Sequence, residues 1–233
     1  MYQWLHDRQC PFKEEVSFIV ACDHENFEFI KFARANGSTV YMRDLLILVQ
    51  DCAAEKGDLG TILWALDQSN KPQNLRKIKI LKEAATHCHM HILEWLETVV
   101  PIEEFVVHAI EQASIEGHVD VLKWVVRNGY QWDAKKDYKY YLRAIENSNL
   151  QALIWMNSCA PIWLWMNSYP SIFACRFGDL NILKWLHKNG CPCDNHTYHE
   201  ALITNKRKIA IWIQQQLFGA RRSRINNSLD IWT

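Results

Sequence analysis

Histidines and cysteines, the side chains best suited to bind a transition metal, gather at two points of this sequence. The two groups are His87, Cys88, His89 and His91, and Cys191, Cys193, His196 and His199. A structural zinc ion needs four such ligands converging in a tetrahedron, usually from two separated pairs. The first group offers no separated pairs, whereas a short loop folding back on itself could bring the second group together.

Catalysis would need other arrangements, and the sequence shows none of them. It contains no phosphate-binding glycine loop, no serine on a nucleophile elbow and no His-Glu-x-x-His motif. The carboxylates are scattered along polar helix faces. We therefore expect a protein that is not an enzyme and that has no cofactor.

The positions of the histidines and cysteines follow a repeat that runs along the chain. The stretch from Ala113 to Asp133 returns as the stretch from Ala174 to Asp194, with Leu-Lys-Trp and Asn-Gly in the same places. Each copy is anchored on an aromatic residue, and neighbouring anchors lie 27 to 32 residues apart. The anchors are Trp4, Phe32, Trp64, Trp95, Trp124, Trp155, Trp185 and Trp212. This spacing is typical of solenoid units.

An alanine stands eleven residues before each of the last seven anchors. These repeat alanines are Ala21, Ala53, Ala84, Ala113, Ala144, Ala174 and Ala201. A small side chain at this position lets another backbone pack closely, so we expect every repeat alanine to be nearly fully buried. Each should lie near the end of the first of two short helices.

A helix terminus favours a residue in the left-handed conformation, which glycine adopts most readily. Four residues after the repeat alanine stand Gly57, Gly117 and Gly178, replaced in the other copies by Glu25, Cys88, Ser148 and Asn205. The second helix carries an apolar stripe that includes the anchor, and Gly37, Gly129 and Gly190 are predicted to end it. Helices this short do not stand alone in water. Each pair must therefore bury its stripe against the next pair, which predicts an all-α solenoid with the anchors packed in its core.

The repeat resembles a known family. Gly-His-Val-Asp-Val-Leu-Lys-Trp-Val-Val-Arg-Asn-Gly, from Gly117 to Gly129, resembles the second helix of an ankyrin repeat. Asn-Gly-Cys-Pro-Cys-Asp after Trp185 resembles a variant common in ankyrin proteins of giant DNA viruses and some protists. The family's Thr-Pro-Leu-His opening is nearly absent, with only His199 in a matching place, and the units are shorter than the usual length of about 33 residues. The resemblance implies an ankyrin-like solenoid of about seven units plus a truncated N-terminal half-unit.

We expect the whole chain to form a single array. Its predicted parts are the half-unit over residues 1–12, the repeats over 13–217 and a C-terminal cap or tail over 218–233. Trp4 already belongs to a second helix, so the first helix of its unit is missing. Apolar surface left exposed there could support self-association.

Composition excludes several classes of protein. Lysine plus arginine and aspartate plus glutamate both number 26, which argues against a nucleic-acid binder. No apolar run approaches the length of a membrane span, and no signal peptide is visible. The eight cysteines recur at repeat positions, as in Cys22 and Cys175 directly after the repeat alanine, which predicts buried free thiols in a reducing compartment. We therefore expect a cytoplasmic location, in the host cytoplasm or the virion if the protein is viral, and no bound metal.

Aromatic side chains in the connectors are the predicted contacts for a protein partner. They are Tyr130, Trp132, Trp163, Trp165 and Tyr169. Connectors are usually polar, but residues 160–166 are apolar. Two interpretations remain open: an exposed aromatic patch for a partner, or packing of one indole onto a neighbouring helix. The flanking Pro161 and Pro170 argue against a long helix and predict at least one exposed indole.

Two basic stretches allow a second kind of contact. One runs from Asn70 to Lys82, and the other joins Arg221, Arg222 and Arg224 to the nearby Lys206–Lys208 segment. The first is either a basic contact patch or a solvated loop and helix face, and the second is either a contact for RNA or phosphate or a solvated C-terminal cap. The solvated surface is the favoured interpretation of both.

The predicted function is a non-enzymatic scaffold that binds a protein partner through connector tips and the concave face. By analogy with ankyrin proteins of giant viruses, that partner would be a host factor. The alternative is a structural component of a virion or assembly that packs against itself or a shell protein.

Overall fold

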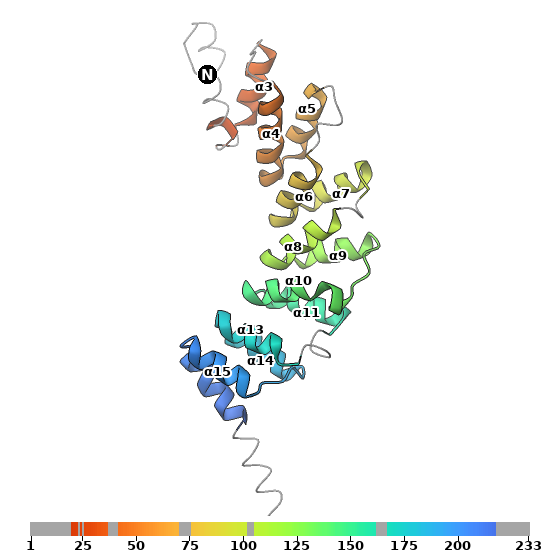
Figure 1. Cartoon of the computed structure of the whole chain (residues 1–233). Coiled ribbons are helices and arrows are strands. Elements are labelled where there is room, and N and C mark those ends of the chain that lie inside the picture. The colour runs from red at the N-terminus through yellow and green to blue at the C-terminus, as the bar shows by residue number, and fades with distance from the viewer. Residues whose placement is uncertain are drawn as a thin grey trace, which may run out of the picture. The chain divides into compact units, whose positions relative to one another are not determined.

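The computed structural model describes residues 20–22, 24, 26–36, 42–69, 76–101, 105–161 and 167–217, and this part of the chain is built from helices joined by short turns (Figure 1). No strand occurs in these ranges, so the predicted all-α class is confirmed for them. The helices are α3 (Phe27–Ala35), α4 (Met42–Lys56), α5 (Leu59–Ser69), α6 (Lys77–Thr86), α7 (Met90–Val99), α8 (Val106–Glu116), α9 (Val119–Arg127), α10 (Ala134–Glu146), α11 (Leu150–Cys159), α13 (Tyr169–Phe177), α14 (Leu180–Lys188) and α15 (Asn195–Ile203). Residues 207–217 are also helical. The half-unit over 1–12 and the tail over 218–233 lie outside the described residues.

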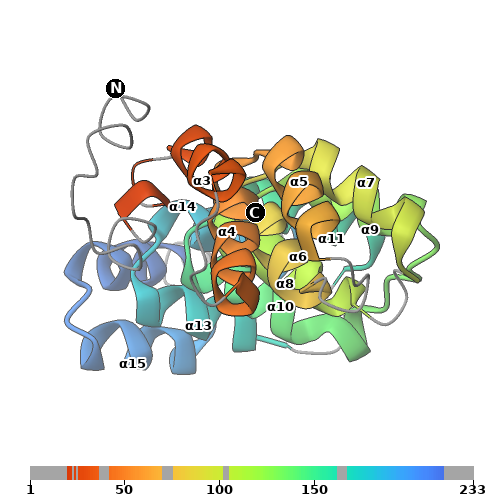
Figure 2. The same ribbon diagram turned by 90° about the horizontal axis from the view of Figure 1, so that it is seen from above.

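The chain divides into two compact units, Met1–Gln112 and Ala113–Thr233, with the boundary inside α8. In the first unit, α4 contacts α5 and α6, and α6 contacts α7 (Figures 1 and 2). In the second unit, α10 contacts α11 and α13, and α13 contacts α14 and α15. Within each unit a helix therefore packs against its own hairpin partner and against the first helix of the next hairpin.

The repeat alanines end the first helices in one common way. Ala21 is 5% exposed and the other six repeat alanines are 0% exposed, as the sequence pattern predicted. The carbonyl of each accepts a hydrogen bond from the backbone N–H five residues further on, for example from His118 to Ala113 at 3.0 Å and from Asn149 to Ala144 at 2.8 Å. This bond closes a Schellman turn, which stops the helix and satisfies an otherwise unpaired carbonyl.

The residue four positions after each repeat alanine is left-handed wherever the structure describes it. The φ angles are +81° at Gly57, +84° at Gly117 and +85° at Gly178. They are +57° at Cys88, +59° at Ser148 and +56° at Asn205. The three non-glycine residues therefore adopt a backbone that L-residues seldom adopt, because the Schellman turn requires it. Glu25 lies outside the described residues.

This strain gives a first prediction. Ser148→Gly should raise the free energy of unfolding by about 0.5–1 kcal/mol, because a left-handed non-glycine residue costs roughly 1–2 kcal/mol and the extra freedom of unfolded glycine offsets part of that gain. Gly117→Ala should lower it by at least about 1 kcal/mol. A Cβ at Gly117 would lie only 2.7 Å from Oδ1 of Asn149. Urea unfolding measures both changes. Ser148→Ala is the control, because alanine at this position retains the strained left-handed backbone. If the glycine and alanine variants at position 148 were equally stable, the strain argument would be wrong.

Three of the second helices, α3, α9 and α14, also share one ending, whereas α7 and α11 end on extended residues, Val100 and Ala160. The asparagines four residues after the anchor, Asn36, Asn128 and Asn189, donate their side-chain N–H to the anchor carbonyl at 2.8, 3.0 and 2.8 Å. Gly129 and Gly190 follow with φ of +90° and +94°, which confirms the predicted helix ends, whereas Gly37 lies outside the described residues.

The anchors themselves are less buried than the sequence predicted. Trp124 is 2% exposed. The remaining described anchors are half-buried: Phe32, Trp64, Trp95, Trp155, Trp185 and Trp212. The fully buried stripe consists of the residues three and two before the anchor and one after it, such as Ile182, Leu183 and Leu186 around Trp185. In a helix the anchor points about 60° away from the residue three before it, so its ring covers the edge of this stripe.

Candidate functional site

The first histidine group ties two neighbouring hairpins together. Nε2 of His89 lies 2.8 Å from the carbonyl oxygen of Glu55, and Nε2 of His91 lies 2.8 Å from that of Gly57. His87 stacks on His89, with ring centroids 5.8 Å apart. The imidazole of His89 thus pairs with a carbonyl of the last turn of α4, which the helix terminus leaves open, and that of His91 pairs with the carbonyl of the left-handed residue just after α4.

The same bridge occurs in the second unit. Nδ2 of Asn149 donates to the carbonyls of Ser114, at 3.4 Å, and Ile115. Lys206 covers Gly178 closely enough that a Cβ on that glycine would lie 2.8 Å from its Nζ. His89, Asn149 and Lys206 all stand five residues after a repeat alanine. That shared position is the sequence signal for this bridge, and sequence reasoning did not use it.

The second group of metal-ligand types does not come together as one cluster. Cys191 is buried, with its Sγ 3.1 Å from Oγ of Ser171, and the Sγ of Cys193 donates to the same Oγ at 3.7 Å. His196 and His199 are exposed. Within the described residues, no three His, Cys, Asp or Glu side chains are grouped so that they could hold a metal ion.

The thiols around Ser171 are held in their neutral form. Burial raises the pKa of Cys175 to about 12 and that of Cys193 to about 11, and it also raises the pKa of Cys191. Each described cysteine is a free thiol, namely Cys22, Cys52, Cys88, Cys159, Cys175, Cys191 and Cys193. Desolvated thiols of this kind are poor nucleophiles, because the thiolate is the reactive form.

These shifts predict slow labelling of the native protein. At pH 8, Cys175 and Cys193 should react with iodoacetamide at least about 100-fold more slowly than in the unfolded chain, since a pKa raised by two units lowers the thiolate fraction by that factor. Because pH 8 lies below both folded pKa values, each unit of added pH should speed the native reaction about tenfold. Mass spectrometry of the labelled peptides gives the rates, with exposed Cys159 as the internal reference. Labelling of Cys193 as fast as Cys159 would contradict the burial argument.

Two of the predicted contact residues are built into an aromatic cluster. Tyr130 donates its hydroxyl to Oδ1 of buried Asp137 at 2.6 Å. Nε1 of Trp132 donates to the hydroxyl of Tyr141 at 2.8 Å, and the Trp132 ring meets that of Trp155 edge-on at 5.7 Å. Both Tyr130 and Trp132 are half-buried. Their main interactions therefore fasten the connector between α9 and α10 onto α10 and α11.

Tyr169 has a different environment. It is 45% exposed at the start of α13, and its ring stacks on Phe173, with centroids 6.1 Å apart. Phe173 in turn meets Phe177 at 4.9 Å, and Phe177 is 39% exposed. Sequence reasoning missed the two phenylalanines, although their spacing of four residues on a helix was the available signal. Trp163 and Trp165 lie outside the described residues.

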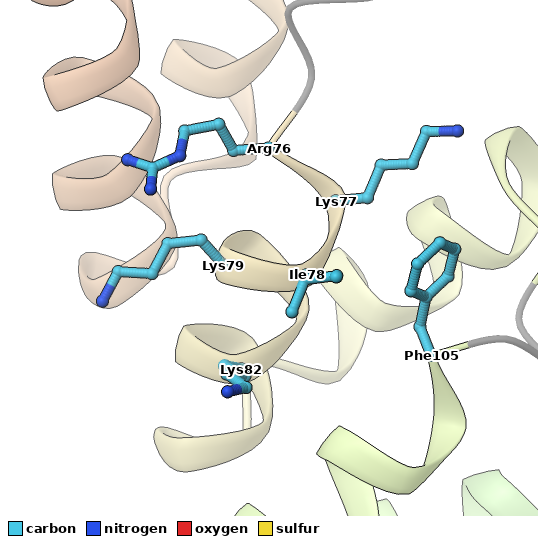
Figure 3. A pocket seen from close by; sticks show the side chains of 6 residues that line it. All are labelled: Arg76, Lys77, Ile78, Lys79, Lys82 and Phe105. Carbon is cyan, nitrogen blue, oxygen red and sulfur yellow. The ribbon is translucent and has the colours of Figure 1, made fainter.

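The described part of the predicted basic stretch, residues 76–82, lines a shallow pocket of about 440 Å³ in the first unit, and residues 70–75 of that stretch lie outside the described residues. It is lined by Arg76, Lys77, Ile78, Lys79, Lys82 and Phe105. Figure 3 shows Lys77 and Phe105 on one side of the first turn of α6, and Arg76 and Lys79 on the other. Arg76 pairs with Asp51 on α4, and Lys79 pairs with Glu83. Two of the four cationic side chains, Arg76 and Lys79, thus already form ion pairs with carboxylates of the protein. This weakens the case for a phosphate-binding site. The predicted basic residues from Arg221 to Arg224 lie outside the described residues.

Comparisons with known proteins add no further assignment. No family model matches the chain, and no curated protein matches it. In the described part of the chain, no helix combines the length and apolar character that crossing a membrane would require.

Proposed function

We propose that this chain is an ankyrin-like solenoid that acts as a non-enzymatic scaffold for a protein partner. The observation that carries the proposal is a hairpin plan repeated at regular sequence spacing. In the described copies, a buried alanine accepts the 6→1 bond and a left-handed residue follows it four positions later. Repetition of one supersecondary unit around a common core defines a solenoid, and solenoids present extended surfaces for binding.

Variation at the exposed positions supports a binding role. The residues five and one before the repeat alanine are Lys79 and Glu83 on α6, but Tyr169 and Phe173 on α13. The repeat alanine stays buried in each copy, while these two partly exposed positions change from charged to aromatic. A scaffold that recognises a partner by side-chain contacts needs this division, because the fold stays constant while the surface specifies the partner.

The free thiols are compatible with the reducing conditions of the cytoplasm, and we propose that location. If the chain is viral, the host cytoplasm or the virion would be the compartment and a host protein the partner. A structural role in a virion or assembly is the second candidate, and exposed aromatic rings on α13 also favour it. Sedimentation at micromolar concentration separates the two, because a stable monomer argues against self-packing.

The packing part of the proposal has a direct test. Ala113→Leu and Ala174→Leu each add three carbon atoms at a position that is 0% exposed. Overpacking of this kind should lower the free energy of unfolding by about 1–3 kcal/mol. Val126→Leu, at an exposed position of α9, is the matched control and should change it by less than about 0.5 kcal/mol. Unchanged denaturant midpoints for both alanine variants would contradict the assignment of these alanines to the buried position of the repeat.

The binding part is tested by affinity capture from cells of the source organism, followed by measurement of the dissociation constant with the purified partner. Saturable binding of one partner to the folded wild-type protein, lost when the protein is unfolded in urea, would support the proposal. The absence of any saturable partner would count against a scaffold role.

A further inference from the structure

The outer face of α13 carries a row of aromatic rings, which we call the α13 stripe: Tyr169, Phe173 and Phe177. The rings follow one another at intervals of four residues, so they lie along one side of the helix. Tyr169 is 45% exposed, Phe173 is half-buried and Phe177 is 39% exposed. Three neighbouring rings in contact with water form a contiguous apolar surface, which is uncommon on a protein that has no use for it.

Packing of the hairpins does not require these rings. The positions that they occupy lie five before, one before and three after the repeat alanine. On α10 the same positions hold Lys139, Arg143 and Asn147, and on α15 they hold His196, Glu200 and Thr204. Both helices adopt the same hairpin plan with polar side chains there. The aromatic character of the α13 stripe is therefore specific to this helix.

The helices beside α13 give the surface a positive charge on one side. α10 contacts α13 and carries Lys135, Lys139 and Arg143 at four-residue spacing, all of them exposed (Figure 1). Arg143 pairs with Glu146 at 3.0 Å, whereas Lys135 and Lys139 have no ion-pair partner among the described residues. On the other side, Arg176 of α13 pairs with Glu200 of α15 at 2.8 Å. The carboxylate of Glu200 on that side is thus paired with a cation, and that of Asp194 accepts a hydrogen bond from Ser168, the residue before Tyr169.

We propose that the α13 stripe docks an acidic segment of a protein partner, whose aromatic or leucine side chains rest on the rings while its carboxylates face Lys135 and Lys139. This inference rests on the proposed scaffold function and names the surface and the chemistry of its partner. Aromatic rings supply most of the contact energy in such interfaces, and complementary charge speeds the encounter. A second copy of this chain is a poorer fit, because the stripe carries no acidic group to meet the lysines of another copy.

The test uses a library of random 16-residue peptides displayed on phage and selected against the wild-type full-length chain. The enriched peptides should contain an aromatic or leucine residue flanked by aspartate or glutamate. Affinity of the best peptide for Tyr169→Ala/Phe177→Ala should fall at least about 30-fold, because aromatic anchors carry much of the binding energy in such interfaces. Lys135→Glu/Lys139→Glu should slow association about tenfold at low salt. Ile211→Ala, which removes exposed apolar surface from the helix over 207–217, should change neither.

Three results would overturn the proposal. The first is an unchanged affinity in the double alanine variant, and the second is enrichment of peptides without carboxylates or of no peptides at all. The third is a wild-type dimer in sedimentation that becomes a monomer in the double alanine variant, which would make a second copy the occupant. If peptides bound the double alanine variant as tightly as the wild type, only the docking role of the α13 stripe would be contradicted. The proposed scaffold function would be unaffected.

Discussion

Tyr141→Ala is expected to lower the free energy of unfolding by about 3–5 kcal/mol, the usual cost of deleting a large buried ring. Tyr141 is 0% exposed on α10. Its hydroxyl donates to the carbonyl of Met156 at 2.9 Å or to that of Ala160 at 2.5 Å, and accepts from Nε1 of Trp132 at 2.8 Å. One side chain therefore joins α10, the end of α11 and the connector before α10. Urea unfolding followed by far-UV circular dichroism measures the loss.

Tyr141→Phe separates the ring from the hydroxyl. It keeps the packing and removes the hydrogen bonds, so it should lower the free energy of unfolding by about 1–3 kcal/mol, the cost of leaving buried polar groups without partners. Tyr138→Ala is the matched control, because Tyr138 is on the same helix but 43% exposed. It should cost less than about 1 kcal/mol. Equal losses for Tyr138→Ala and Tyr141→Ala would show that the cluster around Trp132 does not hold the connector in place.

The backbone plan could be predicted from sequence because few residue types satisfy it. Alanine at the close contact and glycine at the left-handed position are dictated by steric limits that act on single residues. Ser148 shows how this logic extends to a residue that does not favour the conformation. Its spacing from Ala144 predicted the left-handed turn, and φ is +59°.

Side-chain environments were harder to predict, because they depend on what lies across from each residue. Tyr130 and Trp132 look like free aromatics in a connector, yet Asp137 and Tyr141 fall within reach only after α10 folds back beside them. Tyr169, in contrast, is 45% exposed at the start of α13, and its ring stacks on Phe173 of its own helix. Sequence gives the type and register of each aromatic residue, whereas burial depends on the neighbouring hairpin.

Trp124→Ala is the other substitution expected to cost about 3–5 kcal/mol, and Trp185→Ala is its natural comparison. The two tryptophans occupy the same repeat position on α9 and α14, in segments that share Leu-Lys-Trp. Trp124 is 2% exposed, whereas Trp185 is half-buried. Because the loss scales with the apolar area removed from contact, Trp185→Ala should cost only about half as much.

The comparison tests burial against sequence position. If repeat position alone fixed the energetic role of an anchor, the two substitutions would cost the same, and the difference in exposure would have no energetic meaning. If burial decides, the Trp124 variant should unfold at a clearly lower urea concentration than the Trp185 variant, with similar slopes of the free energy against urea. Trp124→Phe gives the final check, because it retains an aromatic ring and should recover more than half of the loss caused by Trp124→Ala.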